Sequence, residues 1–419
     1  MELTTIDDKT YAYLSSVQLS DLFPHSIFYP ILQDELKKES MSLKQEMNEI
    51  TSSSNQKMNS KRVFELSQRV SPSSLLIEKG SPVKCIRTLN NILVICGGSV
   101  MRVYNIENNY ELINTYQLSE NNALTALALT EMLDSNEVYC ALGGESPVIR
   151  IINVLEGKEL KTNQLIGHRN EIYELSISPI YYQILLSSSK DCTVRLWNIE
   201  NAEQLVIFGG PDSHLAEVLS IDWHSSGKLF VSSGVDSSVK LYSITPKMEE
   251  LIKNSIINKE KVIPLIKNYP YYSSTDIHDN YVDCVRFNGN FIISKSVEGV
   301  IKEWLPMFNK EGQYFYLINT YIYSTKEKIY NIKFSFDSTE NIILIGNELG
   351  NGYLFEINEL SEFSNSNFYY FFQSNPKCTI CIKEKTMIRS SHYSSKYGVA
   401  FFGGENGEVF LYDLKCEYK

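Results

Sequence analysis

The sequence predicts an all-β protein that folds as a seven-bladed β-propeller preceded by a polar arm. Two observations carry this prediction. A segment with the pattern of a β-hairpin recurs seven times along the 419 residues. The chain also contains 43% hydrophobic and 12% aromatic side chains, which is enough to bury a large core. Repeats of about 45 residues that each form a four-stranded sheet close into a ring, so seven repeats predict seven blades.

Each repeat consists of an apolar run, a turn of small and polar residues, and a second run in which apolar and polar residues alternate. This order is typical of a β-hairpin. The seven copies occupy residues 92–106, 138–154, 185–199, 229–244, 291–306, 343–357 and 399–414. Each copy closes on a large side chain, and these closing residues are Tyr104, Ile151, Trp197, Tyr242, Trp304, Phe355 and Tyr412. Because the last repeat ends at Leu414, we expect residues 61–79 to supply its outer strand and to close the ring.

The chain divides into an arm, residues 1–60, and a propeller, residues 61–419. Residues 33–57 are polar and become rich in Ser and Asn, so the arm is predicted to be disordered, partly helical or ordered by a partner. Within the propeller, residues 245–275 form an insertion that contains five lysines. This insertion is predicted to be either a partner-binding loop or a neutral addition to the fold.

Composition excludes several classes of function. With 39 basic and 50 acidic side chains the net charge is −11, which argues against sequence-specific binding to nucleic acid. No apolar run approaches the roughly 20 residues of a membrane helix, and the amino terminus lacks the pattern of a secretory signal. The eight cysteines are therefore expected to be reduced. Cys378 and Cys381 form one C-x-x-C without a second pair of ligands nearby, so we predict no metal site and no cofactor.

Three repeats carry a histidine upstream of the hairpin and an acidic residue six positions before the closing aromatic. A carboxylate can orient an imidazole, and a strand hydroxyl can link that imidazole to the aromatic NH or OH. We predict that these side chains hold the blades together and have no catalytic role. They are His168, Asp191, Trp197, His214, Asp236, Tyr242, His278, Glu298 and Trp304.

Several segments resemble one particular family of repeat proteins. The repeat length and the histidine and tryptophan positions are typical of WD40 repeats. The segments GHRNEIYELSISP, HLAEVLSID, DIHDNYVDCVRFNGNFIISKS and KIYNIKFSFD resemble the Polycomb WD-repeat family of embryonic ectoderm development (EED) and Extra sex combs proteins. The likeness runs from about residue 138 to 357 and is closest over 167–300.

The resemblance implies a non-enzymatic scaffold subunit of Polycomb repressive complex 2, a nuclear assembly that methylates lysine on histone H3. It implies as partners a SET-domain histone methyltransferase, other subunits of that complex and the histone H3 tail. Ile172 and Leu175 lie in a matching stretch and would support the blades that bind the methyltransferase, although alternating spacing first predicts core residues.

The resemblance also implies a peptide-binding mouth, where that family holds trimethyl-lysine in an aromatic cage. Aligned first strands place one residue per blade at this entrance: Val83, Leu124, Tyr173, Leu219, Asp283, Tyr330 and Lys383. The four cage positions match Val83, Leu124, Tyr330 and Asn331, of which only Tyr330 is aromatic, so the cage is predicted to be degraded. Four further residues match positions that line the family's histone channel, namely Lys190, Glu217, Tyr281 and Asp283. Simple solvation of a propeller mouth would select polar residues at those positions as well.

Two other functions compete with this hypothesis. A propeller can act outside chromatin, for example as a substrate receptor of a ubiquitin ligase, but the W-D-x-R signature of such receptors is absent from the repeat ends. An enzyme would need convergent acids and bases at the mouth, and the ring offers only Asp283 and Lys383 as charged members. We therefore predict no catalytic residues.

Overall fold

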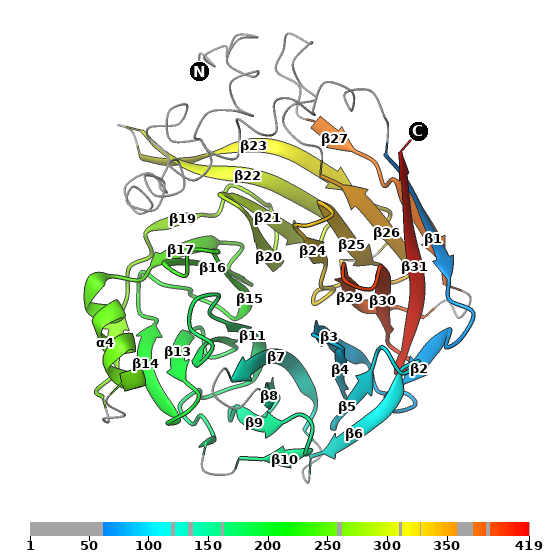
Figure 1. Ribbon diagram of the computed structural model, residues 1–419. Coiled ribbons are helices and arrows are strands. Elements are labelled where there is room, and N and C mark those ends of the chain that lie inside the picture. The colour runs from blue at the N-terminus through cyan, green and yellow to red at the C-terminus, as the bar shows by residue number, and fades with distance from the viewer. Residues whose placement is uncertain are drawn as a thin grey trace, which may run out of the picture.

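Seven sheets, each with four or five strands, form a ring around a central channel in the computed structural model (Figure 1). The structure describes residues 62–418 apart from 119–121, 133–136, 161–162, 258–261, 310–311, 327, 358–371 and 383–385. The predicted arm, residues 1–60, and Lys383 of the predicted mouth lie outside the described residues. The prediction of a seven-bladed all-β propeller is confirmed.

Six blades use their four main strands in chain order from the channel outward, and the last blade takes its outermost strand from before the first blade. The innermost strands are β3 (Val83–Leu89), β7 (Leu124–Met132), β11 (Ile172–Ile177), β15 (Val218–Trp223), β20 (Val282–Asn288), β24 (Ser335–Asp337) and β29 (Ile388–Ser394). The second strands are β4 (Ile92–Gly97), β8 (Glu137–Gly144), β12 (Ile184–Ser189), β16 (Leu229–Gly234), β21 (Phe291–Ser296), β25 (Ile342–Gly346) and β30 (Val399–Gly404).

The third and fourth strands form the outer half of each blade, and the third strand holds the closing residue. The third strands are β5 (Val100–Asn105), β9 (Arg150–Asn153), β13 (Val194–Asn198), β17 (Val239–Ser243), β22 (Val300–Asn309), β26 (Asn351–Glu356) and β31 (Glu408–Tyr418). The fourth strands are β6 (Glu111–Gln117), β10 (Lys158–Glu159), β14 (Glu203–Phe208), β19 (Tyr272–Ser274), β23 (Gly312–Ile322), β28 (Cys378–Cys381) and β1 (Arg62–Gln68). Each predicted closing residue lies on a third strand, so the seven repeats correspond to the seven blades.

The core lies between neighbouring blades because both faces of each sheet are covered. Second strands such as β12 (sequence ILLSSS) and β16 (LFVSSG) are buried along their whole length. One apolar cluster joins Leu241 of the fourth blade to Trp304 of the fifth, and another joins Val94 of the first blade to Leu142 of the second. Each blade therefore depends on its neighbours for most of its buried apolar surface.

The ring closes by pairing the two ends of the propeller. β1 pairs antiparallel with β31 in a register that sets Leu66 opposite Leu414, and β2 (Ser74–Leu76) extends the contact (Figure 1). Phe64 and Leu66 are buried in the adjoining cluster. The expectation that residues 61–79 supply the outer strand of the last blade is confirmed. The pairing removes a sheet edge that would otherwise be exposed.

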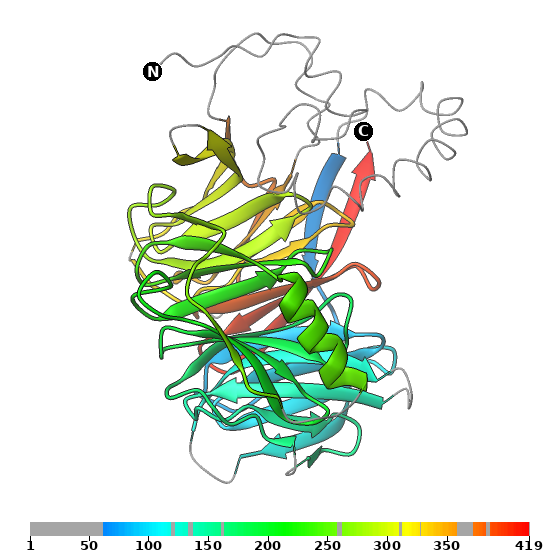
Figure 2. The same cartoon turned by 90° about the vertical axis from the view of Figure 1, so that its left-hand side faces the viewer.

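The insertion at 245–275 is built into two blades. Helix α4 (Pro246–Ile257) lies on the outside of the ring (Figure 2). It buries Met248 and Ile252 in a cluster with side chains of the third blade, and β18 (Leu265–Lys267) pairs parallel with β14. The segment then returns as β19, whose Tyr272 is fully buried beside Trp304. Residues 272–274 are therefore part of the fourth blade itself. A similar parallel strand, β27 (Phe372–Ser374), extends β23.

The innermost strands all begin at one end of the channel, which we call the upper face, and end at the other, which we call the lower face. No helix among the described residues is long and apolar enough to cross a membrane.

Candidate functional site

The third blade contains a buried chain of four polar side chains. His168 binds the Asp191 carboxylate through Nδ1 at 2.9 Å and Ser187 Oγ through Nε2 at 2.6 Å, while Trp197 Nε1 donates to the same Oγ at 2.8 Å. Burial lowers the pKa of His168, so the imidazole is neutral. Burial alone would raise the pKa of Asp191, but His168 and Thr193 hold it well below its usual range. All four side chains of this network are hydrogen-bonded to one another, so the network stabilises the blade.

The fourth blade repeats this arrangement with one change. His214 binds Asp236 at 3.0 Å through Nδ1 and Ser232 Oγ at 2.8 Å through Nε2. The closing residue is Tyr242 instead of tryptophan, and its hydroxyl pairs with Ser213 Oγ at 2.7 Å instead of reaching Ser232. The phenol oxygen lies farther from the backbone than an indole nitrogen, so it reaches the residue beside the histidine.

The fifth blade corrects one of the predicted roles. His278 binds Ser294 Oγ at 2.8 Å, and Trp304 Nε1 donates to the same oxygen at 2.9 Å. Glu298, however, does not take the place of the aspartate, because its longer side chain turns to the upper rim and accepts a hydrogen bond from Lys328 Nζ at 2.8 Å. Burial, with the Lys302 and Lys295 charges, lowers the pKa of His278 to about 3.

At the upper face, a β-bulge at the start of the innermost strand shifts the alternation of its side chains. The register shifts between Ile172 and Glu174, so Tyr173 is the bulged residue of the third blade. The same shift spans Val83 to Cys85 and Leu124 to Ala126. The mouth residues of the first two blades are therefore Lys84 and Thr125.

The assignment of Val83 and Leu124 to the mouth is thus wrong by one residue. Val83 is 0% exposed and Leu124 is 2% exposed, and both belong to apolar clusters between blades. The extra residue of a bulge shifts the alternation of the strand, which a simple alignment does not register. In the last blade the bulge falls between Ile388 and Ser390 and presents Arg389.

Of the remaining residues predicted at the mouth, Leu219 is buried at 1% exposed, and the exposed ones form a polar rim. Tyr330 is 51% exposed and Tyr281 is 43% exposed. Tyr173 OH donates to Glu217 Oε2 at 2.6 Å, and Lys190 Nζ lies 3.6 Å from Glu217 Oε1. Burial and this hydrogen bond to Glu217 raise the pKa of Tyr173.

Asp283 and Asn331 lie beneath that rim. Asp283 is fully buried, where it accepts hydrogen bonds from Lys295 Nζ at 2.6 Å and from the Asn331 backbone NH at 2.8 Å. Asn331 has a φ of 64°, a left-handed conformation that asparagine tolerates. Asp283 therefore holds the chain that carries Tyr330 and Asn331 and is not a ligand group of the mouth.

Ile172 and Leu175 are core residues. They are 0% and 2% exposed and belong to the apolar cluster between the second and third blades, which also contains Trp197. Their support for any partner would act through the packing of those blades.

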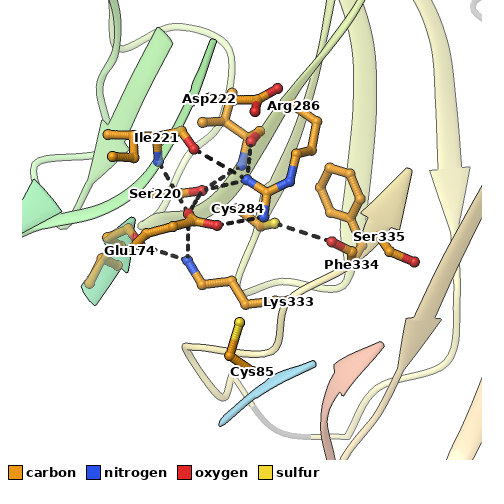
Figure 3. A network of polar contacts seen from close by, with 12 residues as sticks. Cys85, Glu174, Ser220, Ile221, Asp222, Cys284, Arg286, Lys333, Phe334 and Ser335 are labelled. Carbon is orange, nitrogen blue, oxygen red and sulfur yellow. Dashed lines mark hydrogen bonds and ion pairs between the residues drawn. The ribbon is translucent and has the colours of Figure 1, made fainter. Parts of the chain in front are cut away.

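The channel interior holds a polar network that the sequence analysis missed (Figure 3). The Glu174 carboxylate accepts hydrogen bonds from Arg286 Nη2 at 2.5 Å and Ser220 Oγ at 2.5 Å, and Lys333 Nζ lies at 3.4 Å. Burial would raise the pKa of Glu174, but the Arg286 and Lys333 charges lower it to about 2. The network joins the third, fourth, fifth and sixth blades.

A ring of residues from all seven blades, which we call the lower channel ring, shares Arg286 and Lys333 with this network and extends below it. The ring holds one residue from each blade at an equivalent position, which in the third blade is four residues after Ile172. Its members are Arg87, Ala128, Ser176, Asp222, Arg286, Lys333 and His392. Four of these are charged and one is histidine, and six of them line a cavity of about 330 Å³. Charged residues recurring at one position of otherwise apolar strands are the signal that could have revealed this ring.

Two buried groups of the ring have shifted pKa values. Burial raises the pKa of Asp222 to about 6, and burial together with the Arg87 charge lowers the pKa of His392 to about 3. No group of three or more His, Cys, Asp or Glu side chains that could hold a metal ion is present in the part of the chain that the structure describes.

Comparison with known proteins agrees with the fold. The WD domain, G-beta repeat family matches residues 157–198 and 204–243. A chain in the crystal structure of the Chaetomium thermophilum polycomb repressive complex 2 aligns with a TM-score of 0.70 at 16% identity, over 83% of this chain and 98% of that chain. A second structure of that complex, with H3K27me3 and H3K27M, contains a chain that aligns with a TM-score of 0.71 at 15% identity, again over 83% and 98%.

Two curated relatives have a higher sequence identity to this chain than these structures do. Polycomb protein esc of Drosophila melanogaster is 36% identical over 239 residues, which cover 54% of this chain and 56% of the fly protein. Polycomb group protein FIE2 of Zea mays is 30% identical over 324 residues, which cover 72% of this chain and 81% of the maize protein. The matched region thus spans little more than half the length of the fly relative.

The fold, the histidine networks and the repeat pattern define a WD-repeat β-propeller. Within that class, the match to the maize protein identifies the family, because it covers 81% of that protein at 30% identity. The chain belongs to the Polycomb family that contains the esc and FIE proteins, which confirms the resemblance read from the sequence.

Proposed function

We propose that this protein is a non-catalytic scaffold subunit of a Polycomb repressive complex 2-like histone H3 lysine methyltransferase. In this role it binds and stabilises the SET-domain catalytic subunit, joins other subunits of the complex and acts in the nucleus. The observation that carries the proposal is family membership over most of the propeller, since 81% of the maize Polycomb relative is matched. The Chaetomium chains with the same fold come from structures of that complex.

Affinity purification of the tagged full chain from its own cells tests this proposal. We expect a SET-domain methyltransferase among the copurifying chains, and loss of histone H3 lysine methylation when the protein is depleted. Recovery of a cullin and its adaptor in place of a methyltransferase would contradict the proposal and favour a ubiquitin ligase receptor.

We also propose that the mouth contacts the histone H3 tail without an aromatic cage. Glu171 and Glu217 supply carboxylates at a rim that also carries the cations Lys84, Lys190 and Arg389, and those carboxylates suit a basic peptide. A quaternary ammonium requires several aromatic faces. Lys84 and Thr125 stand where two of those faces would be, and the Lys84 ammonium repels a second cation.

Titration of histone H3 tail peptides tests the mouth. We expect unmodified and trimethylated peptides to bind with affinities within about twofold of each other, and Glu217→Gln to weaken both. Glu156→Gln, on an exposed residue outside the mouth, is the control. A tenfold preference for trimethyl-lysine that is lost in Tyr330→Ala would overturn this part of the proposal.

A further inference from the structure

The lower half of the channel contains a cavity of about 330 Å³ that is separate from the mouth. Its walls come from the ends of the innermost strands and include Leu89, Leu129 and Phe336. These three side chains are partly exposed. A volume of this size accommodates a side chain or a small organic molecule.

Positive side chains outnumber negative ones around this cavity. Three cations, Arg87, Arg286 and Lys333, face the carboxylates of Glu174 and Asp222. Glu174 is occupied by the short contacts to Arg286 and Lys333. Asp222 accepts a hydrogen bond from the backbone NH of Phe287 at 2.8 Å, and its raised pKa leaves part of the population neutral near pH 6. The cavity therefore carries an excess of positive charge.

Arg87 is the cation that this network uses least. Its Nη1 donates to the carbonyl of Ile86 at 2.9 Å, and the ion pair recorded for it among the described residues is a long contact of 3.8 Å to Glu174. Its side chain is 31% exposed, although it lies on an innermost strand. A guanidinium in this position can bind a carboxylate through two parallel hydrogen bonds.

A hydroxyl group complements the arginine. Ser335 is one of the residues that line the same cavity, and its Oγ is buried and has no hydrogen-bond partner among the residues that the structure describes. A buried polar atom without a partner is costly, so a ligand that accepts its hydrogen bond gains free energy. The other walls are apolar, with Ile177, Ile221 and Phe334 among them.

We propose that the lower channel cavity binds a carboxylate on an apolar stem, with Arg87 pairing with the carboxylate, Ser335 donating to it, and the apolar walls enclosing the stem. The ligand is either the side chain of an acidic residue flanked by apolar residues in a peptide or a free organic acid. A phosphate dianion fits less well, because Glu174 and Asp222 lie close and repel a second negative charge more strongly. This proposal is independent of the role in a methyltransferase complex.

Ligand-observed NMR with the full chain tests the proposal. The probes are hexanoate, its neutral analogue hexanamide, and the capped peptide acetyl-Leu-Glu-Leu-amide with its glutamine counterpart. We expect saturable one-to-one binding of hexanoate or the glutamate peptide, and affinity at least tenfold weaker for the matching amide. Tighter binding of the peptide identifies an acidic side chain as the ligand, and tighter binding of hexanoate identifies a free acid.

Two variants separate the site from general effects on folding. Arg87→Met removes the charge and keeps the apolar stem, whereas Leu129→Trp narrows the cavity and keeps every charge. We expect each to weaken acid binding at least tenfold. Arg169→Met removes an exposed arginine at the upper face and should leave binding unchanged. Equal binding of acid and amide, unchanged binding in both cavity variants, or no saturable binding at about 10 mM would overturn the proposal.

Discussion

At the scale of single residues, the charged groups inside the channel have the largest expected effect on stability. Glu174 is buried with two cations, and removing one partner of a buried ion network leaves the other charges without compensation. Asp222 differs, because its carboxylate forms no ion pair among the residues that the structure describes, and burial raises its pKa. These two carboxylates should therefore respond to substitution in opposite directions.

Glu174→Ala should lower the free energy of unfolding by about 3–5 kcal/mol, since Arg286 and Lys333 would remain buried without their carboxylate. Urea denaturation followed by circular dichroism measures the change. Glu156→Ala is the matched control, because Glu156 forms an exposed ion pair with Lys158 and should cost under about 0.5 kcal/mol. Equal effects of the two substitutions would show that the channel network contributes no stability.

Asp222→Asn should stabilise the protein, and the gain should depend on pH. The pKa of Asp222 is raised in the folded state from 3.8 to about 6, so folding of the wild type becomes less favourable as pH rises through this window. The asparagine variant does not titrate and avoids this cost, which is of the order of 1–3 kcal/mol above pH 6.

Unfolding free energies of both proteins at pH 4, 6 and 8 measure this effect. The difference between variant and wild type should be largest at pH 8 and should shrink between pH 6 and pH 4. A difference that is constant over this range would disprove the raised pKa.

At the scale of structural elements, the histidine networks fix the second and third strands of a blade to the loop that precedes the first strand. Ser187 provides the junction in the third blade, since its hydroxyl meets both His168 and Trp197. The next residue, Ser188, is equally buried, but its hydroxyl has no hydrogen-bond partner among the described residues. The two adjacent serines form a natural pair for an experiment.

Ser187→Ala should cost about 2–4 kcal/mol, because it leaves the imidazole and the indole NH without a partner. Ser188→Ala should be neutral or slightly stabilising, because it removes an unsatisfied hydroxyl. Thermal or urea unfolding compares the two variants. Comparable losses of stability in both would mean that burial of the hydroxyl matters and the network does not.

The closing strand β1 is the other element with a clear energetic role. Phe64→Ala should cost about 3–5 kcal/mol, because the ring is buried in the cluster of the last two blades. Glu65→Ala, at the neighbouring exposed position, is the control. Limited proteolysis should cleave the Phe64 variant faster near the β1 and β31 pair, and equal cleavage of both variants would argue against closure by β1.

At the scale of the whole molecule, three buried histidines and the half-buried His392 couple stability to pH. Burial lowers the pKa values of His168 and His214 and brings those of His278 and His392 to about 3. Each is neutral in the folded protein but takes up a proton in the unfolded chain below pH 6.5, so stability falls as pH decreases from that value. His278 and His392, whose pKa values fall to about 3, each contribute about 1 kcal/mol per pH unit between pH 6.5 and that value.

Urea unfolding at pH 7.5 and pH 5.5 measures this effect, and the midpoint should be lower at pH 5.5. The loss should be steeper in the Asp222→Asn variant, because protonation of Asp222 on acidification partly offsets the histidines in the wild type. An unchanged or higher midpoint at pH 5.5 would contradict neutral buried histidines.

The sequence predicted the parts of this molecule that depend on local pattern. Seven hairpins with their closing residues, the supply of the last outer strand from before the first repeat, and the Polycomb relationship were all readable, because strand alternation and repeat spacing are local properties. The positions of Val83, Leu124 and Glu298 were misjudged. A bulge shifts alternation by one residue, and the longer glutamate side chain reaches a different partner.

By itself the sequence determined the number of blades and their common architecture. Only the tertiary structure decided what the inside of the ring contains. Glu174, Ser220, Arg286 and Lys333 are separated by up to 159 residues and meet because seven similar sheets turn the same strand toward one axis. The free energy of a buried charge depends on such neighbours from other blades, and no single repeat specifies them.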